Sequence, residues 1–155
     1  MQMPSPTEQH RKLAALEGEW VGEETLHPSP WAPETRTAIG RFSSRIDLDG
    51  MYLVTDYVES RDGSVVFRGH GVFGWSAKQE RYTMHWFDSM GMPPNETLGA
   101  WEGDSLVFSG SGEHGHGRYV YTLRGDDRMA FRIESSKDGN AWTTIMEGEY
   151  RRARA

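Results

Sequence analysis

The sequence contains no cysteine, so disulfide bonds, cysteine metal sites and a thiol nucleophile are all excluded. It also has no apolar run approaching the roughly 20 residues that a membrane-spanning helix needs. Residues 1–6 show neither the basic nor the apolar region of a signal peptide, which predicts a cytoplasmic protein. Basic clusters are missing apart from the arginines near residue 152, and the net charge is −6. We therefore expect neither nucleic acid nor a membrane as a partner.

A short helix is predicted near the start of the chain. Ser5 is suited to cap a helix, Pro6 to fill its first position and Glu8 to complete a capping box. Leu13 and Leu16 are spaced to share one helical face. The length of 155 residues fits one domain with a substantial core, so we expect a single domain over 1–155.

After this helix the sequence shows only two-residue alternation, which is typical of β-strands. Turn signals such as Asp49-Gly50, Asp62-Gly63 and Asp138-Gly139 separate the alternating segments. About ten strands joined mostly by short turns predict an all-β, closed up-and-down antiparallel barrel, because closure removes exposed strand edges. We expect flexible residues 1–5, a helix over 6–17 that covers one end, and a barrel over 18–151, with strands near 18–27, 36–46, 51–61, 64–76, 80–89, 96–102, 105–112, 117–125, 128–136 and 140–151.

The aromatic and methionine side chains on the inner strand faces predict first of all a core. Side chains can fill the interior of a barrel of roughly eight strands, and a barrel of ten strands is wider than that. The strand count therefore predicts a cavity. In a meander, alternate connections emerge at the same end, so the long segments 27–33, 88–94 and 112–117 should form a mouth opposite the helix. The candidate ligand-binding residues are Trp31, Tyr82, Met84, Trp86, Asp88, Met90, Met92, Tyr119, Tyr121, Phe131 and Trp142.

The junction between helix and first strand reads Leu16-x-Gly18-x-Trp20, and this motif resembles the opening of the calycin superfamily, the lipocalins and fatty-acid-binding proteins. That resemblance implies that a C-terminal arginine packs over Trp20, and the structural motif is assigned to Gly18, Trp20 and Arg151, with Arg152 as the alternative. Further features make the chain similar to the bacterial lipocalin-like family known as domain of unknown function 1579, which implies a fold but no settled activity. These features are the strand Gly69-x-Gly71-x-x-Gly74-Trp75, Tyr82 and the segment Trp86-x-Asp88-Ser89-Met90.

Three motifs suggest cofactors, and each has a simpler explanation. The segment 69–74 matches the dinucleotide fingerprint G-x-G-x-x-G, but a turn follows it instead of the required helix, so its glycines are expected to relieve crowding. His114 and His116 are weak metal candidates, and a solvated hairpin loop is the favoured interpretation because structural zinc usually needs four ligands. Haem needs an inward axial ligand, and His70 and His85 face inward only if the strand faces are reversed. We therefore expect no cofactor.

Binding of a small, largely apolar molecule inside the barrel is the function that these patterns favour. An enzyme that acts on a small hydrophobic substrate through an inward carboxylate (Asp88, Glu24 or Asp56) or a histidine is the second hypothesis, and we rank it below binding. A structural or interaction barrel with a filled core is the third. The expected partner is a small hydrophobic ligand, and a homodimer is left open.

Overall fold

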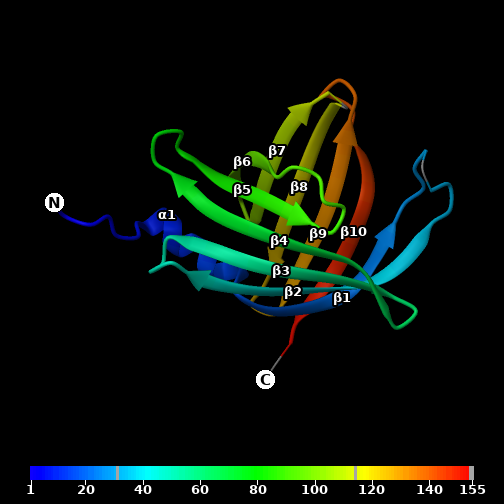
Figure 1. Ribbon diagram of the computed structural model, residues 1–155, viewed down its shortest axis with the longest axis horizontal. Coiled ribbons are helices and arrows are strands. Elements are labelled where there is room, and N and C mark those ends of the chain that lie inside the picture. Colours follow the sequence, from blue (N-terminus) through cyan, green and yellow to red (C-terminus); the bar gives the residue numbers. More distant parts are fainter. Residues whose placement is uncertain (31, 114, 154–155) are drawn as a thin grey trace.

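Ten antiparallel strands close into a barrel in the computed structural model, which describes residues 1–30, 32–113 and 115–153 (Figure 1). Each strand pairs with its neighbours in sequence, and β1 pairs with β10 to complete the ring. The predicted closed up-and-down antiparallel barrel is therefore confirmed. The strands are β1 (Gly18–Leu26), β2 (Arg36–Asp47), β3 (Tyr52–Arg61), β4 (Ser64–Ser76), β5 (Arg81–Asp88), β6 (Asn95–Glu102), β7 (Ser105–Gly112), β8 (Gly115–Arg124), β9 (Arg128–Ser136) and β10 (Thr143–Arg152).

The N-terminal helix starts later than the sequence pattern predicts. An α-helical turn, α1 (Glu8–Arg11), continues into a 3₁₀ segment, η1 (Lys12–Leu16). Thr7, and not Ser5, is the N-cap. Its backbone N–H donates to Nδ1 of His10 at 3.0 Å, so a histidine takes the capping-box role expected of Glu8. Within the described part of the chain, neither helical segment is long and apolar enough to cross a membrane.

The helical segments cover one end of the barrel, which we call the closed end. Leu13 and Leu16 are 1% and 4% exposed, and both belong to the hydrophobic core. Trp20 on β1 is 1% exposed, and its indole N–H donates to the carbonyl of Leu16 at 3.0 Å. The first strand is thereby fastened to the helix that precedes it.

An arginine does stack on Trp20, but it is Arg152 and not Arg151. The Arg152 guanidinium carbon lies 4.1 Å from the ring centroid, and Trp20 and Arg152 are paired across β1 and β10. Arg151 is exposed because successive residues of a strand face opposite sides, and its neighbour Tyr150 points inward. Gly18 has a φ of +126°, and a side chain there would collide with Arg152, which explains the glycine in this motif.

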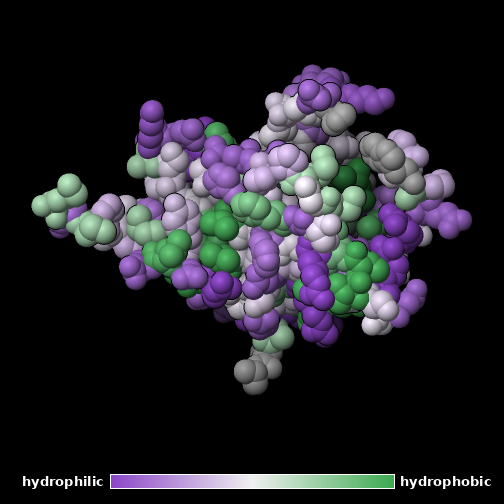
Figure 2. Space-filling view, viewed as in Figure 1, coloured by the Kyte–Doolittle hydropathy of each residue, from purple (hydrophilic) through white to green (hydrophobic). Residues whose placement is uncertain are grey.

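Alternate connections lie at opposite ends of the barrel, and all of the longest ones lie at the same end. The turns between β2 and β3, β4 and β5, β6 and β7, and β8 and β9 are short and lie at the closed end with the helix (Figure 1). The longer connections follow β1, β5 and β9 and lie at the opposite end, which we call the mouth. On the face shown in Figure 2, hydrophilic and hydrophobic side chains are interspersed, and a group of hydrophobic side chains reaches the surface toward the mouth.

Candidate ligand cavity

A cavity of about 1310 Å³ occupies the mouth half of the barrel. Three connections border it, and all follow odd-numbered strands: residues 27–30 after β1, Met90 after β5, and Lys137, Asp138 and Ala141 after β9. Trp31, predicted at this rim, lies outside the described residues. Met92 is 71% exposed and is not among the residues that line the cavity.

Aromatic and methionine side chains form the cavity wall. Among the predicted ligand-binding residues, Met84, Trp86, Tyr119, Tyr121 and Phe131 line it together with Asp88 and Met90. The rings pack against one another: Tyr121 and Phe131 have centroids 4.6 Å apart, and Tyr57 and Trp86 have centroids 6.1 Å apart. Such a wall presents a large apolar area in a fixed shape, which suits a hydrophobic ligand.

Two glycines of β4 make room for the indole of Trp86. A side chain at Gly69 would collide with the Trp86 ring, and one at Gly71 would lie 3.1 Å from Phe73 and 3.2 Å from Trp86. Gly71 is paired with Trp86 across β4 and β5. The glycine pattern of segment 69–74 therefore serves close packing inside a barrel strand, where no helix follows.

Tyr82 belongs to the closed end and not to the cavity. Its side chain is 2% exposed, its hydroxyl donates to the backbone carbonyl of Gln9 at 2.7 Å, and its ring packs edge-on against Trp75 with centroids 4.8 Å apart. It lies on the same inner face of β5 as Met84 and Trp86, but further from the mouth. The alternation pattern identifies the face of this residue but not its depth in the barrel.

Trp142, predicted to face inward with Met146 and Tyr150, lies outside the cavity. The pairing of β10 with β9 shifts between Thr144 and Met146, so Ile145 is an extra residue in the strand. A bulge of this kind reverses the alternation of the residues that precede it. Trp142 instead lies under the guanidinium of Arg118, 4.1 Å from its ring centroid.

A buried carboxylate occupies the interior near the cavity. Glu24 on β1 is fully buried and accepts hydrogen bonds from the hydroxyl of Tyr57, at 2.7 and 2.8 Å to its two oxygens, and from the hydroxyl of Tyr150. Burial raises the pKa of Glu24, the two tyrosine hydrogen bonds oppose that rise, and the charge of Glu59 adds to it. Burial together with the charge of Glu24 also raises the pKa of both tyrosines, so they remain hydrogen-bond donors.

Polar residues continue from this carboxylate toward the mouth along β3. Tyr57, Glu59 and Arg61 are spaced two apart and share the inner face. The Tyr57 hydroxyl oxygen also lies 3.2 Å from one oxygen of Glu59, and Nη2 of Arg61 donates to the other Glu59 oxygen at 3.2 Å. A single chain of polar contacts therefore connects the mouth to Glu24.

Arg36 and Arg61 line the cavity, and the sequence analysis did not single them out. The alternation of inward and outward residues along β2 does predict that Arg36 faces inward. Counting back by twos from inward Phe42 leads through Gly40 and Ala38 to Arg36. We expected both arginines to face outward because they are charged and lie at strand ends, and arginine is mostly exposed in folded proteins.

Asp88 is half-buried at the mouth and already has hydrogen-bond donors. Its Oδ2 accepts from the indole N–H of Trp86 at 2.9 Å, and its Oδ1 accepts from the backbone N–H of Met90 at 2.9 Å. Burial raises the pKa of Tyr119, and the charge of Asp88 raises it further. Asp88 therefore fixes both the Trp86 ring and the start of the loop that carries Met90.

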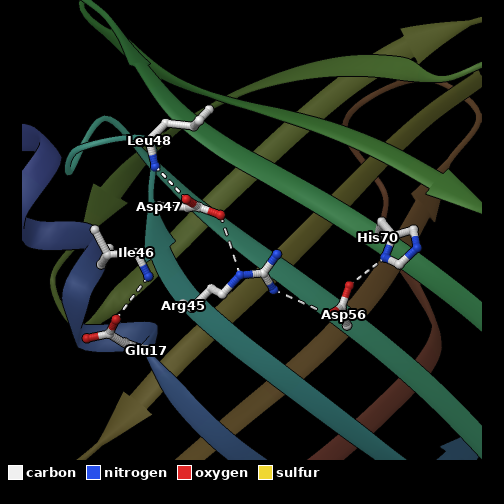
Figure 3. Close-up of polar contacts among 7 residues, drawn as sticks. All are labelled: Glu17, Arg45, Ile46, Asp47, Leu48, Asp56 and His70. Carbon is white, nitrogen blue, oxygen red and sulfur yellow. Dashed lines mark hydrogen bonds and ion pairs between the residues drawn. The ribbon is translucent and has the colours of Figure 1, made fainter.

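Asp56, a candidate inward carboxylate, faces outward. It lies in a row of exposed polar contacts on β2, β3 and β4: Arg45 is 3.4 Å from Asp56, and Nδ1 of His70 is 2.6 Å from Asp56 (Figure 3). His85 also faces outward, 3.0 Å from Glu96. The prediction for Asp56 was wrong because polar residues occupy both faces of β3, so alternation alone did not assign its side.

The weak metal candidates are only partly described. His114 lies outside the described residues, and His116 lies near Trp142, with ring centroids 6.5 Å apart. Over residues 1–30, 32–113 and 115–153, no group of three or more histidine, aspartate and glutamate side chains is placed to hold a metal ion.

Comparisons with known proteins agree with this architecture. The family model described as "Protein of unknown function (DUF1579)" matches residues 5–152. The fold is similar to the crystal structure of Rv2717c from M. tuberculosis, with a TM-score of 0.71 and 12% identity over 96% of this chain and 99% of that chain. It is also similar to the S-type phycobiliprotein lyase CPES from Guillardia theta, with a TM-score of 0.67 and 9% identity over 96% of this chain and 94% of that chain. No curated protein matches the sequence. Because the family model spans nearly the whole barrel, the chain belongs to the DUF1579 family of proteins of unknown function.

Proposed function

We propose that the protein binds a small, largely apolar molecule in the mouth half of the barrel. The observation that carries this proposal is the cavity of about 1310 Å³, which exceeds the roughly 300–1,000 Å³ typical of small-molecule sites. Aromatic rings from β3, β5, β8 and β9 surround it. A barrel with a filled core would have side chains in this space, so the cavity favours binding over a purely structural role.

Polar groups at the cavity would orient the ligand. Asp88 and Tyr119 at the mouth, and Tyr57 deeper in the barrel, line a wall that is otherwise mostly apolar. A few polar groups among apolar ones are typical of sites that select a ligand by shape and orientation. The likeness to a phycobiliprotein lyase extends only to the fold at 9% identity, so the proposal depends on the cavity itself.

Fluorescence of the neutral apolar dye N-phenyl-1-naphthylamine tests this proposal. We expect saturable dye fluorescence and quenching of protein fluorescence, because Trp86 lines the cavity. The variant Ile133→Trp places a larger side chain on the cavity wall and should weaken dye binding about tenfold or more, since it removes the space for the ring system.

The matched control is Ile39→Trp, because Ile39 is 41% exposed and lies on the outer face of β2. This variant should bind the dye as the parent protein does. Absence of saturable binding to the parent protein, or equal loss in both variants, would contradict the proposal.

A further inference from the structure

Two arginines line the cavity at its mouth. Arg36 is the first residue of β2 and Arg61 the last of β3, and both strand ends lie opposite the helix (Figure 1). The β2–β3 register pairs Ile39 with Ser60. Continued by one pair, it sets Ala38 opposite Arg61, so Arg36 and Arg61 are diagonal neighbours on the inner face. Two guanidinium groups therefore border one part of the cavity.

The hydrogen bonding of these guanidinium groups is incomplete. Arg61 donates to Glu59 through Nη2, but its Nε is buried and has no partner among the described residues. The Nε of Arg36 is also buried without a partner, and no acceptor or acidic group pairs with Arg36 in the described part of the chain. The remaining N–H groups of the Arg36 guanidinium have no acceptor among the described residues, so they can donate to an acceptor on a ligand in the cavity.

The carboxylates that line the cavity already have donors. Asp88 accepts from Trp86 and Met90, and Glu59 accepts from Arg61. At the rim, backbone N–H groups of residues 141 and 140 and the hydroxyl of residue 136 hold the pKa of Asp138 at about 2. A cationic ligand would have to compete with these donors, whereas an anionic ligand meets arginine donors that lack acceptors.

We propose that the ligand is an amphipathic anion that binds with its carboxylate at the mouth, beside Arg36 and Arg61. Its apolar part then extends inward against Tyr121 and Phe131. Guanidinium groups suit this role because their planar N–H fork matches a carboxylate and remains charged at all relevant pH values. This inference rests on the proposed function and adds the chemical class and the orientation of the ligand.

Three probes of equal chain length test the charge preference. Decanoate, decan-1-ol and decyltrimethylammonium are each used at pH 7.5 to displace N-phenyl-1-naphthylamine from the full chain. We expect decanoate to bind at least about tenfold more tightly than either of the others, the size expected for a hydrogen bond to a charged group.

Variants of Arg36 identify the group responsible. Arg36→Gln should weaken decanoate binding about tenfold and leave decan-1-ol binding unchanged. The affinity of Arg36→Lys for decanoate should lie between those of the parent protein and Arg36→Gln. The control Arg41→Gln removes an exposed arginine from the outer face of the same strand and should change neither affinity. Retained dye binding by Arg36→Gln shows that the variant folds.

The outcomes separate this inference from the function on which it rests. If the dye does not bind to the parent protein, both fail. If the dye binds but decanoate has no advantage over decan-1-ol, or decyltrimethylammonium binds most tightly, only the anion inference is overturned. A decanoate preference that persists in Arg36→Gln would overturn the assignment to Arg36.

Discussion

An arginine stacks on Trp20 and another on Trp142, but the two tryptophans differ in burial. In both Trp20 and Trp142, a guanidinium carbon lies 4.1 Å from the ring centroid. Trp20 is fully buried and bonded to the helix, whereas Trp142 is half-buried on the outside of the barrel. The difference between the two sites therefore isolates the effect of burial from that of stacking.

Trp20→Ala should lower the free energy of unfolding by about 3–5 kcal/mol, the range for truncation of a buried aromatic residue. Trp142→Ala should lower it by about 1 kcal/mol, the size of an exposed cation–π contact. Urea unfolding of the two variants measures both quantities. Equal losses would mean that burial at the closed end contributes little to stability.

The buried carboxylate of Glu24 should make stability depend on pH. Burial raises its folded-state pKa above the ordinary value of 4.5, so the folded protein binds a proton more tightly than the unfolded chain does. The free energy of unfolding therefore falls as pH rises through 4.5 and levels off above the folded-state pKa. Glu24→Gln cannot ionise, so its stability relative to the parent should improve between pH 4 and pH 7.

Glu23→Gln is the matched control, since Glu23 is the adjacent residue on the exposed face of β1. Its stability difference from the parent should be nearly constant over the same pH range. A constant difference for Glu24→Gln as well would show that Glu24 ionises in the folded protein as readily as in the unfolded chain. Urea unfolding at several pH values gives the comparison.

At the scale of elements, alternation predicted the strands well because the inner faces of the barrel strands are mostly apolar. It failed for Trp142, since the extra residue at Ile145 reverses the alternation in β10 and leaves no signature in composition. It failed for Asp56 because β3 carries polar residues on both faces. The helix start was misplaced because the capping partner is a histidine, which the usual capping-box pattern does not include.

The helical segment acts as the floor of the barrel, and its leucines should matter accordingly. Leu13→Ala should cost about 2–5 kcal/mol, because Leu13 is 1% exposed and packs in the core with Trp20. Lys12→Ala, one residue earlier on the exposed side, should change stability by no more than about 0.5 kcal/mol. Urea unfolding measures both, and a similar small change in both variants would mean that the helix is not part of the cooperative core.

At the scale of the whole molecule, the sequence predicted a closed barrel with a mouth but not the polar lining of that mouth. Parity of a meander fixes which connections share an end, and the connections after β1 and β5 border the cavity as predicted. The predicted segment 112–117 is mostly strand, and none of its described residues lines the cavity. The chain of polar contacts from Arg61 to Glu24 joins β3 to β1 through residues that are not consecutive in sequence. Such contacts depend on side-chain depth and direction, which a linear pattern does not contain.

Closure of the ring gives the last prediction. At the β1–β10 seam, residues 20–26 pair with residues 146–152, so neither strand has a free edge there. Two side-chain contacts cross the same seam: Arg152 stacks on Trp20, and the Tyr150 hydroxyl donates to Glu24. Paired amides of β1 and β10 should therefore exchange their hydrogens as slowly as those of β8 and β9, and only when the barrel unfolds as a whole. Native-state hydrogen exchange at increasing urea measures this. Faster exchange confined to β1 and β10 would show that the seam opens before the rest of the barrel unfolds.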